Sequence, residues 1–190
     1  MNKFKALIAS LLISGVAAPV VAAPSYERSD EIQEHVELLT EIQDLGIKVV
    51  INHPKLCGDS NVAGFWHGSM NLFALCQENI RRAKVPVWNG NTVMLTDDDL
   101  DTIRHEAHHV IQDCMDGKID GNLQPYFGDA NRRREFLDAY PDWKEQSITE
   151  EYSEDGADPH VIKLEVEAWA VADLITAPSI SNVMNRVCSR

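Results

Sequence analysis

Apolar and polar positions along the chain alternate with helical spacing in some stretches and with the spacing of strands in others. Over residues 26–45, apolar side chains recur every three or four positions and face a row of glutamates. The apolar positions are Ile32, Val36, Leu39, Ile42 and Leu45, and the acidic ones are Glu31, Glu34, Glu37 and Glu41. Glycine commonly ends a helix, and Gly46 follows directly. This pattern predicts an amphipathic helix over residues 26–45.

Short apolar runs bounded by turn residues come next. Residues 47–51 predict a strand, and residues 63–66 and 71–76 predict a β-hairpin around Gly68 and Ser69. Residues 85–88 and 92–95 predict a further strand pair around the turn at 89–91. The predicted strands therefore precede the most clearly marked helix of the chain.

That helix covers residues 96–115. Thr96 is a favourable N-cap, and Asp99 holds the capping-box position three residues later. One face carries only apolar side chains, namely Leu100, Ile103, Ala107, Val110, Ile111 and Cys114. Gly117 is the expected end of the segment. The pattern predicts a helix with one face in the core and a polar opposite face.

The C-terminal part has further helical character. Residues 117–128 predict a loop, residues 129–147 two short helices separated at Pro141, residues 149–159 an acidic surface loop, and residues 160–176 a long helix. Together with the upstream strands, this order predicts a small α+β domain with a helical C-terminal part.

The N-terminus has the features of a secretory signal peptide. Lys3 and Lys5 precede an apolar run and a stretch of small residues. We expect residues 1–22 to be removed before Ala23, with cleavage after Ala17 as the alternative. Residues 23–190 would then form one domain that is secreted or periplasmic, and no later apolar run is long enough to span a membrane.

The net charge limits the range of partners. The whole chain has a formal charge of −13, and loss of Lys3 and Lys5 with the signal peptide would make it −15. Nucleic acid is therefore excluded as an expected partner, because its phosphates attract basic surfaces. The oligomeric state is left open.

Cysteine usage agrees with export. Four cysteines lie in the mature chain, and an even number in an exported protein indicates disulfides. Of the three pairings, we favour Cys57 with Cys76, across the predicted hairpin, and Cys114 with Cys188, which ties the 96–115 helix to the C-terminus. A four-cysteine zinc site is disfavoured because no C-x-x-C spacing occurs.

The polar face of the 96–115 helix carries a metal-binding motif. Residues 105–109 are His-Glu-Ala-His-His, which contains H-E-x-x-H. His105 and His109 are one turn apart and can bind the same zinc ion. Glu106 would then act as the general base for a metal-activated water. We interpret His108 as a polar flanking residue or an outer partner of the site.

A catalytic zinc site needs a third protein ligand. In the predicted helix 160–176, Glu165 shares a face with apolar residues, where a carboxylate is costly unless it is paired or metal-bound. Glu167 lies on the opposite side, one turn from Lys163, as in an ordinary surface pair. We therefore predict Glu165 as the third ligand and rank Glu167 second. Weaker alternatives are Asp173, His160, and Glu150 or Glu151.

These two helices resemble those of the gluzincin metallopeptidases, in which an H-E-x-x-H helix is followed by a helix bearing Glu-x-x-Ala. The stretch Glu165-Val166-Glu167-Ala168 is similar to the signatures of the ImmA/IrrE-type peptidases and of the CAAX-prenyl endopeptidases. The resemblance implies a zincin-like fold with Glu165 as zinc ligand. Trp169 departs from the Asn or Asp of those families, and residues 117–159 form an insertion.

The expected function is that of a secreted zinc-dependent metallopeptidase with one zinc ion per chain and a peptide or protein substrate. Tyr126, Tyr152 and His160 are unranked candidates for stabilising the oxyanion, and either predicted hairpin could bind the extended substrate. Two alternatives remain, a non-catalytic exported zinc-binding protein on a zincin scaffold and a cell-wall amide hydrolase.

Overall fold

The computed structural model of the chain describes residues 25–58, 62–77 and 95–189. The predicted signal peptide at residues 1–22 lies outside these ranges, as does the predicted strand pair at residues 85–95 apart from Leu95.

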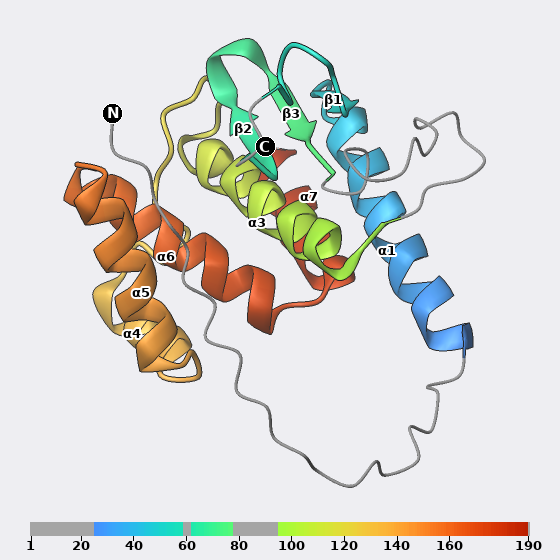
Figure 1. Cartoon of the computed structure of the whole chain (residues 1–190). Helices are drawn as coiled ribbons and strands as arrows, with labels where there is room; N and C mark the ends of the chain where they lie inside the picture. The colour runs from blue at the N-terminus through green and yellow to red at the C-terminus, as the bar shows by residue number, and fades with distance from the viewer. Residues whose placement is uncertain (1–24, 59–61, 78–94, 190) are drawn as a thin grey trace, which may run out of the picture.

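The described residues form an α+β fold of six α-helices and one three-stranded sheet (Figure 1). The helices are α1 (Ser25–Asp44), α3 (Asp97–Asp113), α4 (Ala130–Leu137), α5 (Asp142–Glu154), α6 (Pro159–Leu174) and α7 (Ala177–Cys188). The strands are β1 (Lys48–Ile51), β2 (Gly64–His67) and β3 (Leu72–Leu75), and 3-10 turns cover Gly68–Met70 and Cys114–Asp116. The predicted fold class is confirmed.

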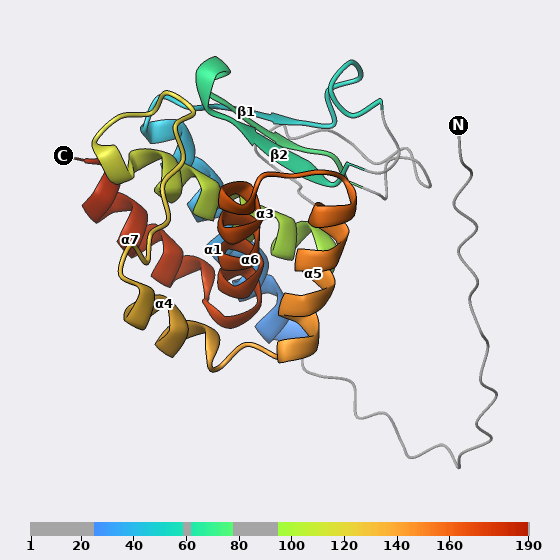
Figure 2. The same ribbon diagram turned by 90° about the vertical axis from the view of Figure 1, so that its left-hand side faces the viewer.

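The sheet has the strand order β1-β3-β2. The central strand β3 is parallel to β1, with Lys48 opposite Leu72, and antiparallel to β2, with Gly64 opposite Leu75. The predicted hairpin at residues 63–76 is therefore present. All four residues of β3 are buried, because neighbouring strands flank it and α3 packs against the sheet. Figure 2 shows the sheet lying across the helices.

Helix α3 lies at the centre of the molecule and contacts β2, β3, α1, α6 and α7. Its predicted apolar face is buried, and the core around it includes Leu38 and Leu39 of α1, Phe73 of β3 and Met184 of α7. The predicted capping box is formed, since Thr96 accepts from the Asp99 amide and Asp99 accepts from the Thr96 amide. After the 3-10 turn, Gly117 ends the segment with a φ of 83°, a conformation that favours glycine.

Two parts of the C-terminal region differ from the prediction. Residues 149–154 continue α5 instead of forming a surface loop, because α5 packs on α6 and the Tyr152 hydroxyl bonds Glu165. Helix α7 is not predicted by the sequence analysis, whose last predicted element ends at residue 176. It begins after Thr176, buries Ile180 and Met184 against the core, and contacts α1 and α3.

The structure confirms both predicted disulfides, Cys57–Cys76 and Cys114–Cys188. The first joins the segment after β1 to the end of β3, and the second joins the end of α3 to the end of α7. Disulfides of this kind persist in oxidising compartments, which fits an exported protein. Among the described residues, no helix is long and apolar enough to cross a membrane.

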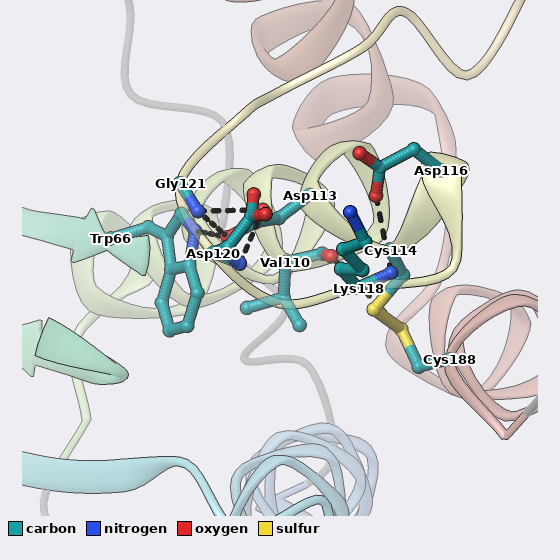
Figure 3. The surroundings of a disulfide bond; sticks show 9 residues. All are labelled: Trp66, Val110, Asp113, Cys114, Asp116, Lys118, Asp120, Gly121 and Cys188. Carbon is teal, nitrogen blue, oxygen red and sulfur yellow. Dashed lines mark hydrogen bonds between the residues drawn. A yellow bond between two sulfur atoms is a disulfide. The ribbon is translucent and has the colours of Figure 1, made fainter. Parts of the chain in front are cut away.

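A buried carboxylate fixes the chain beside the second disulfide (Figure 3). Asp113 is fully buried and accepts hydrogen bonds from the backbone amides of Asp120 and Gly121 and, at 3.0 Å, from the Trp66 indole. A Cβ added to Gly68 would lie 2.3 Å from both Asp113 Oδ2 and Gly121 Cα. This close approach holds the loop after α3 against the hairpin.

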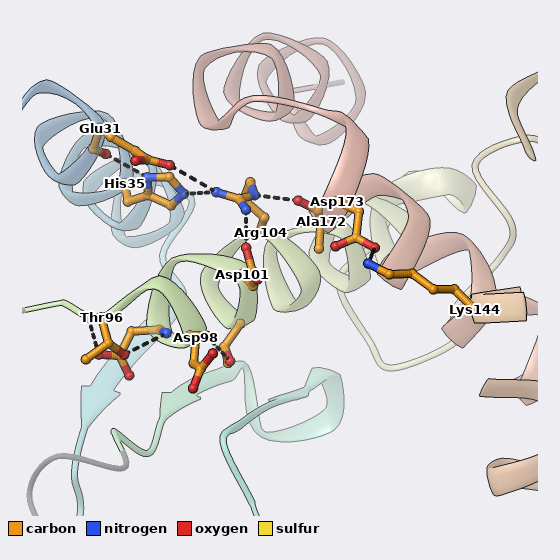
Figure 4. A network of polar contacts seen from close by, with 11 residues as sticks. Glu31, His35, Thr96, Asp98, Asp101, Arg104, Lys144, Ala172 and Asp173 are labelled. Atoms are coloured by element: carbon orange, nitrogen blue, oxygen red, sulfur yellow. Dashed lines mark hydrogen bonds and ion pairs between the residues drawn. The ribbon is translucent and has the colours of Figure 1, made fainter. Parts of the chain in front are cut away.

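Arg104 of α3 connects three helices (Figure 4). Its Nε donates to the Ala172 carbonyl in α6 at 2.6 Å, and its Nη1 donates to His35 Nε2 in α1 at 2.8 Å. His35 Nδ1 in turn donates to the Glu31 carbonyl at 2.7 Å. A guanidinium group can only donate, so the buried His35 ring must accept at Nε2 and is neutral.

We expect His35 to make the protein less stable in mild acid. Burial lowers the pKa of His35 below its ordinary value of 6.5, and the Arg104 charge adds to this effect. The unfolded chain therefore takes up a proton at a higher pH than the folded chain. This contribution to the free energy of unfolding is present above the ordinary pKa and is lost as the pH falls below it toward the folded pKa.

The measurement is urea unfolding at about pH 7.5 and about pH 5, a range in which histidine titrates. The wild type should lose more stability between the two conditions than His35→Gln does. His53→Gln, at an exposed position, is the control and should keep the wild-type pH dependence. Equal pH dependence in His35→Gln and the wild type would contradict the assignment.

Candidate metal centre

Helix α3 places the two predicted histidine ligands next to each other. His105 and His109 are one turn apart and are 5% and 6% exposed. Their Nε2 atoms are 3.0 Å apart, and their rings meet edge to face. The two nitrogens therefore face a common point on the side of α3 that packs against α6.

Helix α6 brings a carboxylate to this point. Glu165 Oε2 lies 3.3 Å from His105 Nε2, and Glu165 Oε1 lies 3.5 Å from His109 Nε2. The ligand atoms of the three residues all lie within 4.8 Å of one another, so they could hold one metal ion. The structure thus brings together the three residues that the sequence analysis selects, although 56 positions separate His109 from Glu165.

The hydrogen bonds around His109 engage Nδ1 and leave Nε2 available for a metal ion. Gln112 Nε2 donates to the Leu164 carbonyl and to Glu167 Oε1, both at 3.1 Å. Because both of these partners only accept, the Gln112 amide oxygen must face His109 Nδ1, which lies 2.7 Å away and donates to it. When His109 gives up its Nε2 proton to a bound metal, its lone pair is therefore on Nε2, as a ligand requires.

The charges within the cluster favour a cation. Burial opposes a charge on His109, but the hydrogen bond to Glu165 and the charges of Glu106 and Glu165 outweigh burial and raise the pKa of His109 to about 9. Burial would likewise raise the pKa of Glu165, but the hydrogen bonds from His105 and His109 hold it well below its usual range. The site thus stabilises positive charge between these side chains.

His105 differs from His109 in its outer contacts. Its Nδ1 is buried and has no hydrogen-bond partner among the described residues. The Trp169 ring packs on the His105 ring, with 4.4 Å between centroids. The Trp169 contact therefore holds the orientation of the His105 imidazole ring.

Glu106 lies beside the cluster and under the first residue of β2. It is 6% exposed, and a Cβ added to Gly64 would lie 3.5 Å from Glu106 Cγ and 2.6 Å from Thr102 Cγ2. Glycine at position 64 thus allows β2 to approach α3 closely at this carboxylate. Among the described strands, β2 is an edge strand and lies beside Glu106. The other predicted hairpin, at residues 85–95, lies outside the described residues apart from Leu95.

Of the three candidates for oxyanion stabilisation, Tyr152 alone contacts the cluster. Its hydroxyl donates to Glu165 Oε2 at 2.9 Å, and the Glu165 charge together with burial raises the pKa of Tyr152. Tyr126 packs against His108 instead, and the exposed His160 bonds the Leu123 carbonyl. The continuation of α5 beyond residue 149 is what carries Tyr152 to the site.

Glu167 is not the surface partner of Lys163 that its position on the helical wheel predicts. It is fully buried and accepts hydrogen bonds from His108 Nε2 at 2.9 Å and from the backbone amides of Tyr126 and Phe127. The prediction was wrong because this side of α6 faces His108 and Gln112 of α3 and is also covered by loop 117–128. Burial opposes the charge of Glu167, but the hydrogen bond from His108 keeps its pKa below the usual value.

His108 is an outer partner, as one of our two interpretations has it. It is 2% exposed, and burial lowers its pKa. Through Glu167 and Gln112 it connects to His109 Nδ1. The role of Gln112 is missed by the sequence analysis. Gln112 follows His109 by three residues, and residues at this spacing are neighbours on a helix, so the contact could have been predicted from the sequence.

The weaker alternatives for the third ligand lie away from the cluster. Asp173 pairs with Lys144 at 2.6 Å, and Glu150 accepts from the neighbouring Gln146. Glu151 is exposed. A cavity of about 960 Å³ opens at the C-terminal end of α3. Among the described residues that line it, Tyr126 is the only one that we predict as part of the site.

Fold and site together define an α+β domain with a three-residue candidate metal site. The chain belongs to the family described as a domain of unknown function, DUF8637, whose model matches residues 30–189. No curated protein and no solved structure matches the chain. The match covers all the residues of the cluster and its outer partners, so the site lies within the family domain.

We expect Glu167→Gln to destabilise the protein by about 3 kcal/mol, because removing one partner of a buried charged network leaves the others unpaired. An amide at this position would also direct hydrogen-bond donors at the backbone amides of loop 117–128. Urea unfolding measures the effect, and Glu154→Gln at an exposed position is the matched control. A change below about 0.5 kcal/mol, typical of surface substitutions, would contradict the network.

Proposed function

We propose that this chain is an exported zinc-dependent metallopeptidase. The observation that carries the proposal is the convergence of two imidazole nitrogens and one carboxylate within 4.8 Å, next to the buried Glu106. Burying a carboxylate costs free energy unless it is paired or hydrogen-bonded, so a carboxylate at this buried position supports a role in the chemistry of the site. The H-E-x-x-H pattern supplies that role in the form of a general base.

The donor set fits zinc. Two imidazoles and one carboxylate are three protein ligands, and a catalytic zinc site keeps a further position open. Imidazole also suits iron, copper and nickel, so the identity of the metal is part of the test. When bound, zinc supplies a lowered water pKa and polarisation of a carbonyl group.

The side chains of this chain have separate roles in the proposed reaction. Glu106 would accept a proton from the attacking water and donate it to the leaving amine as the peptide C–N bond breaks. The Tyr152 hydroxyl donates its one proton to Glu165 Oε2, and it would turn from that carboxylate to the oxyanion as the oxyanion forms. Gln112 and Glu167 would hold the His109 ring in its ligating tautomer.

Export is supported independently of the site. Two disulfides link distant parts of the chain, and such bonds form in oxidising compartments. The predicted signal peptide at residues 1–22 agrees with this location. The proposed site of action is therefore secreted or periplasmic.

The alternatives differ in what they require of Glu106. A non-catalytic zinc-binding protein needs the three ligands but no general base, and the burial of Glu106 beside the cluster favours the enzyme. A cell-wall amide hydrolase would use the same residues, because it cleaves the same type of bond. The choice of substrate in the assay separates it from a peptidase.

The test compares the oxidised protein from residue 23 onward with two variants of the site and one control variant. Elemental mass spectrometry over zinc, iron, copper and nickel gives the metal content, and denatured casein, a peptide library and peptidoglycan serve as substrates. We expect about one zinc per wild-type chain, as three ligands to one ion imply. Glu165→Gln should weaken zinc binding by more than the roughly 10–100-fold that loss of an outer partner costs.

Glu106→Gln should retain zinc and lose hydrolysis by about 100-fold or more, the usual contribution of general acid–base catalysis. Glu154→Gln, an exposed glutamate at the end of α5, should match the wild type in both assays. Wild-type activity in Glu106→Gln would contradict its role as general base, and iron, copper or nickel in place of zinc would contradict the zinc assignment. Zinc without turnover of any substrate would favour the non-catalytic alternative.

A further inference from the structure

A cavity of about 350 Å³ lies between α5 and α6 and extends to the start of α3. Its volume is at the lower end of the roughly 300–1,000 Å³ of ligand pockets. Five of the residues that line it are apolar or aromatic, namely Tyr140, Trp143, Ile148, Tyr152 and Trp169.

This cavity shares two side chains with the candidate metal centre. The Trp169 ring lines the cavity and packs on His105, with 4.4 Å between centroids. Tyr152 also lines it, and its hydroxyl donates to Glu165 Oε2. A group in the cavity would therefore be separated from the ligand cluster by a single layer of side chains.

The chemistry of the walls favours an uncharged occupant. Of the charged lining groups, Lys144 pairs with Asp173 at 2.6 Å and Asp101 pairs with Arg104. Glu151 also lines the cavity and is exposed to solvent. The Lys144 Nζ lies 5.8 Å from the centroid of the Trp143 ring. Trp143 is 67% exposed, an unusual position for a tryptophan. The walls thus offer mainly aromatic surface, with most of the lining charges already paired.

We propose that this cavity binds a large apolar side chain of the peptide substrate, aromatic or branched aliphatic, close to the bond that is cleaved. The proposal rests on the proposed peptidase function and names its substrate preference. Helix α5 supplies Trp143, Ile148 and Tyr152, so the insertion at residues 117–159 builds the specificity pocket. Residues 117–159 would thus determine substrate preference, whereas the two motif helices supply the metal ligands and the general base.

The test fills the cavity from α5. Ser147 is exposed and lines the cavity, and Ser147→Trp should occupy it without disturbing the core. Gln146→Trp adds the same side chain at the adjacent exposed position, which is not part of the lining, and is the matched control. Trp143→Ala removes part of the wall and is a second variant should Ser147→Trp fail to fold.

The first readout is kcat/KM on a peptide series that differs at one residue near the cleaved bond. Wild type and Gln146→Trp should prefer phenylalanine or leucine to alanine by about tenfold or more, the range that apolar pockets provide. Ser147→Trp and Trp143→Ala should each lose most of that preference. Hydrolysis with equal rates across the series, or a preference unchanged in both variants, would overturn the pocket while leaving the peptidase in place.

The second readout does not require turnover. Saturation-transfer NMR with N-acetyl-phenylalanine amide should show contact with the wild type and with Gln146→Trp, and a much weaker signal with Ser147→Trp and with N-acetyl-alanine amide. Such binding without hydrolysis of any peptide would keep the apolar pocket and overturn the peptidase. Hydrolysis without this difference in binding would overturn the pocket.

Discussion

The packing of α6 on α3 is the constraint on which the site depends. It places Glu165 against His105 and His109, and it buries Glu167 against His108 and Gln112. Neither helix alone holds the three converging donors. The Cys114–Cys188 disulfide ties the end of α3 to α7, and Arg104 ties the middle of α3 to α1 and α6.

Burial of most of these polar groups is tolerable because they hydrogen-bond to one another, His105 Nδ1 being the exception among the described residues. The carboxylate of Glu167 accepts from one imidazole, one side-chain amide and two backbone amides. Gln112, held by Glu167, accepts from His109 Nδ1 and so orients the His109 ring. The Tyr152 hydroxyl donates to Glu165. Fully satisfied polar networks rigidify a site, whereas partial ones are expensive. Loop 117–128 and α5 therefore belong to the same functional unit as the motif helix.

Local chemistry predicted much of this structure. The capping box at Thr96, the apolar face of α3, the hairpin around Gly68 and both disulfides follow from short-range patterns, and so does the choice of Glu165 over Glu167 as the residue at the cluster. The burial of Glu167 did not follow, because it depends on two tertiary contacts, with α3 at His108 and Gln112 and with loop 117–128. The extent of α5 was likewise decided by its packing on α6, which a wheel drawn for one helix does not contain.

The measurement that tests the central claim most directly is zinc K-edge X-ray absorption of the zinc-loaded protein. If His105, His109 and Glu165 hold the ion, the first shell contains only nitrogen and oxygen at about 2.0–2.2 Å. Outer-shell scattering should then correspond to two imidazoles. Sulfur scattering at about 2.3 Å, or a shell without imidazole, would contradict the assignment.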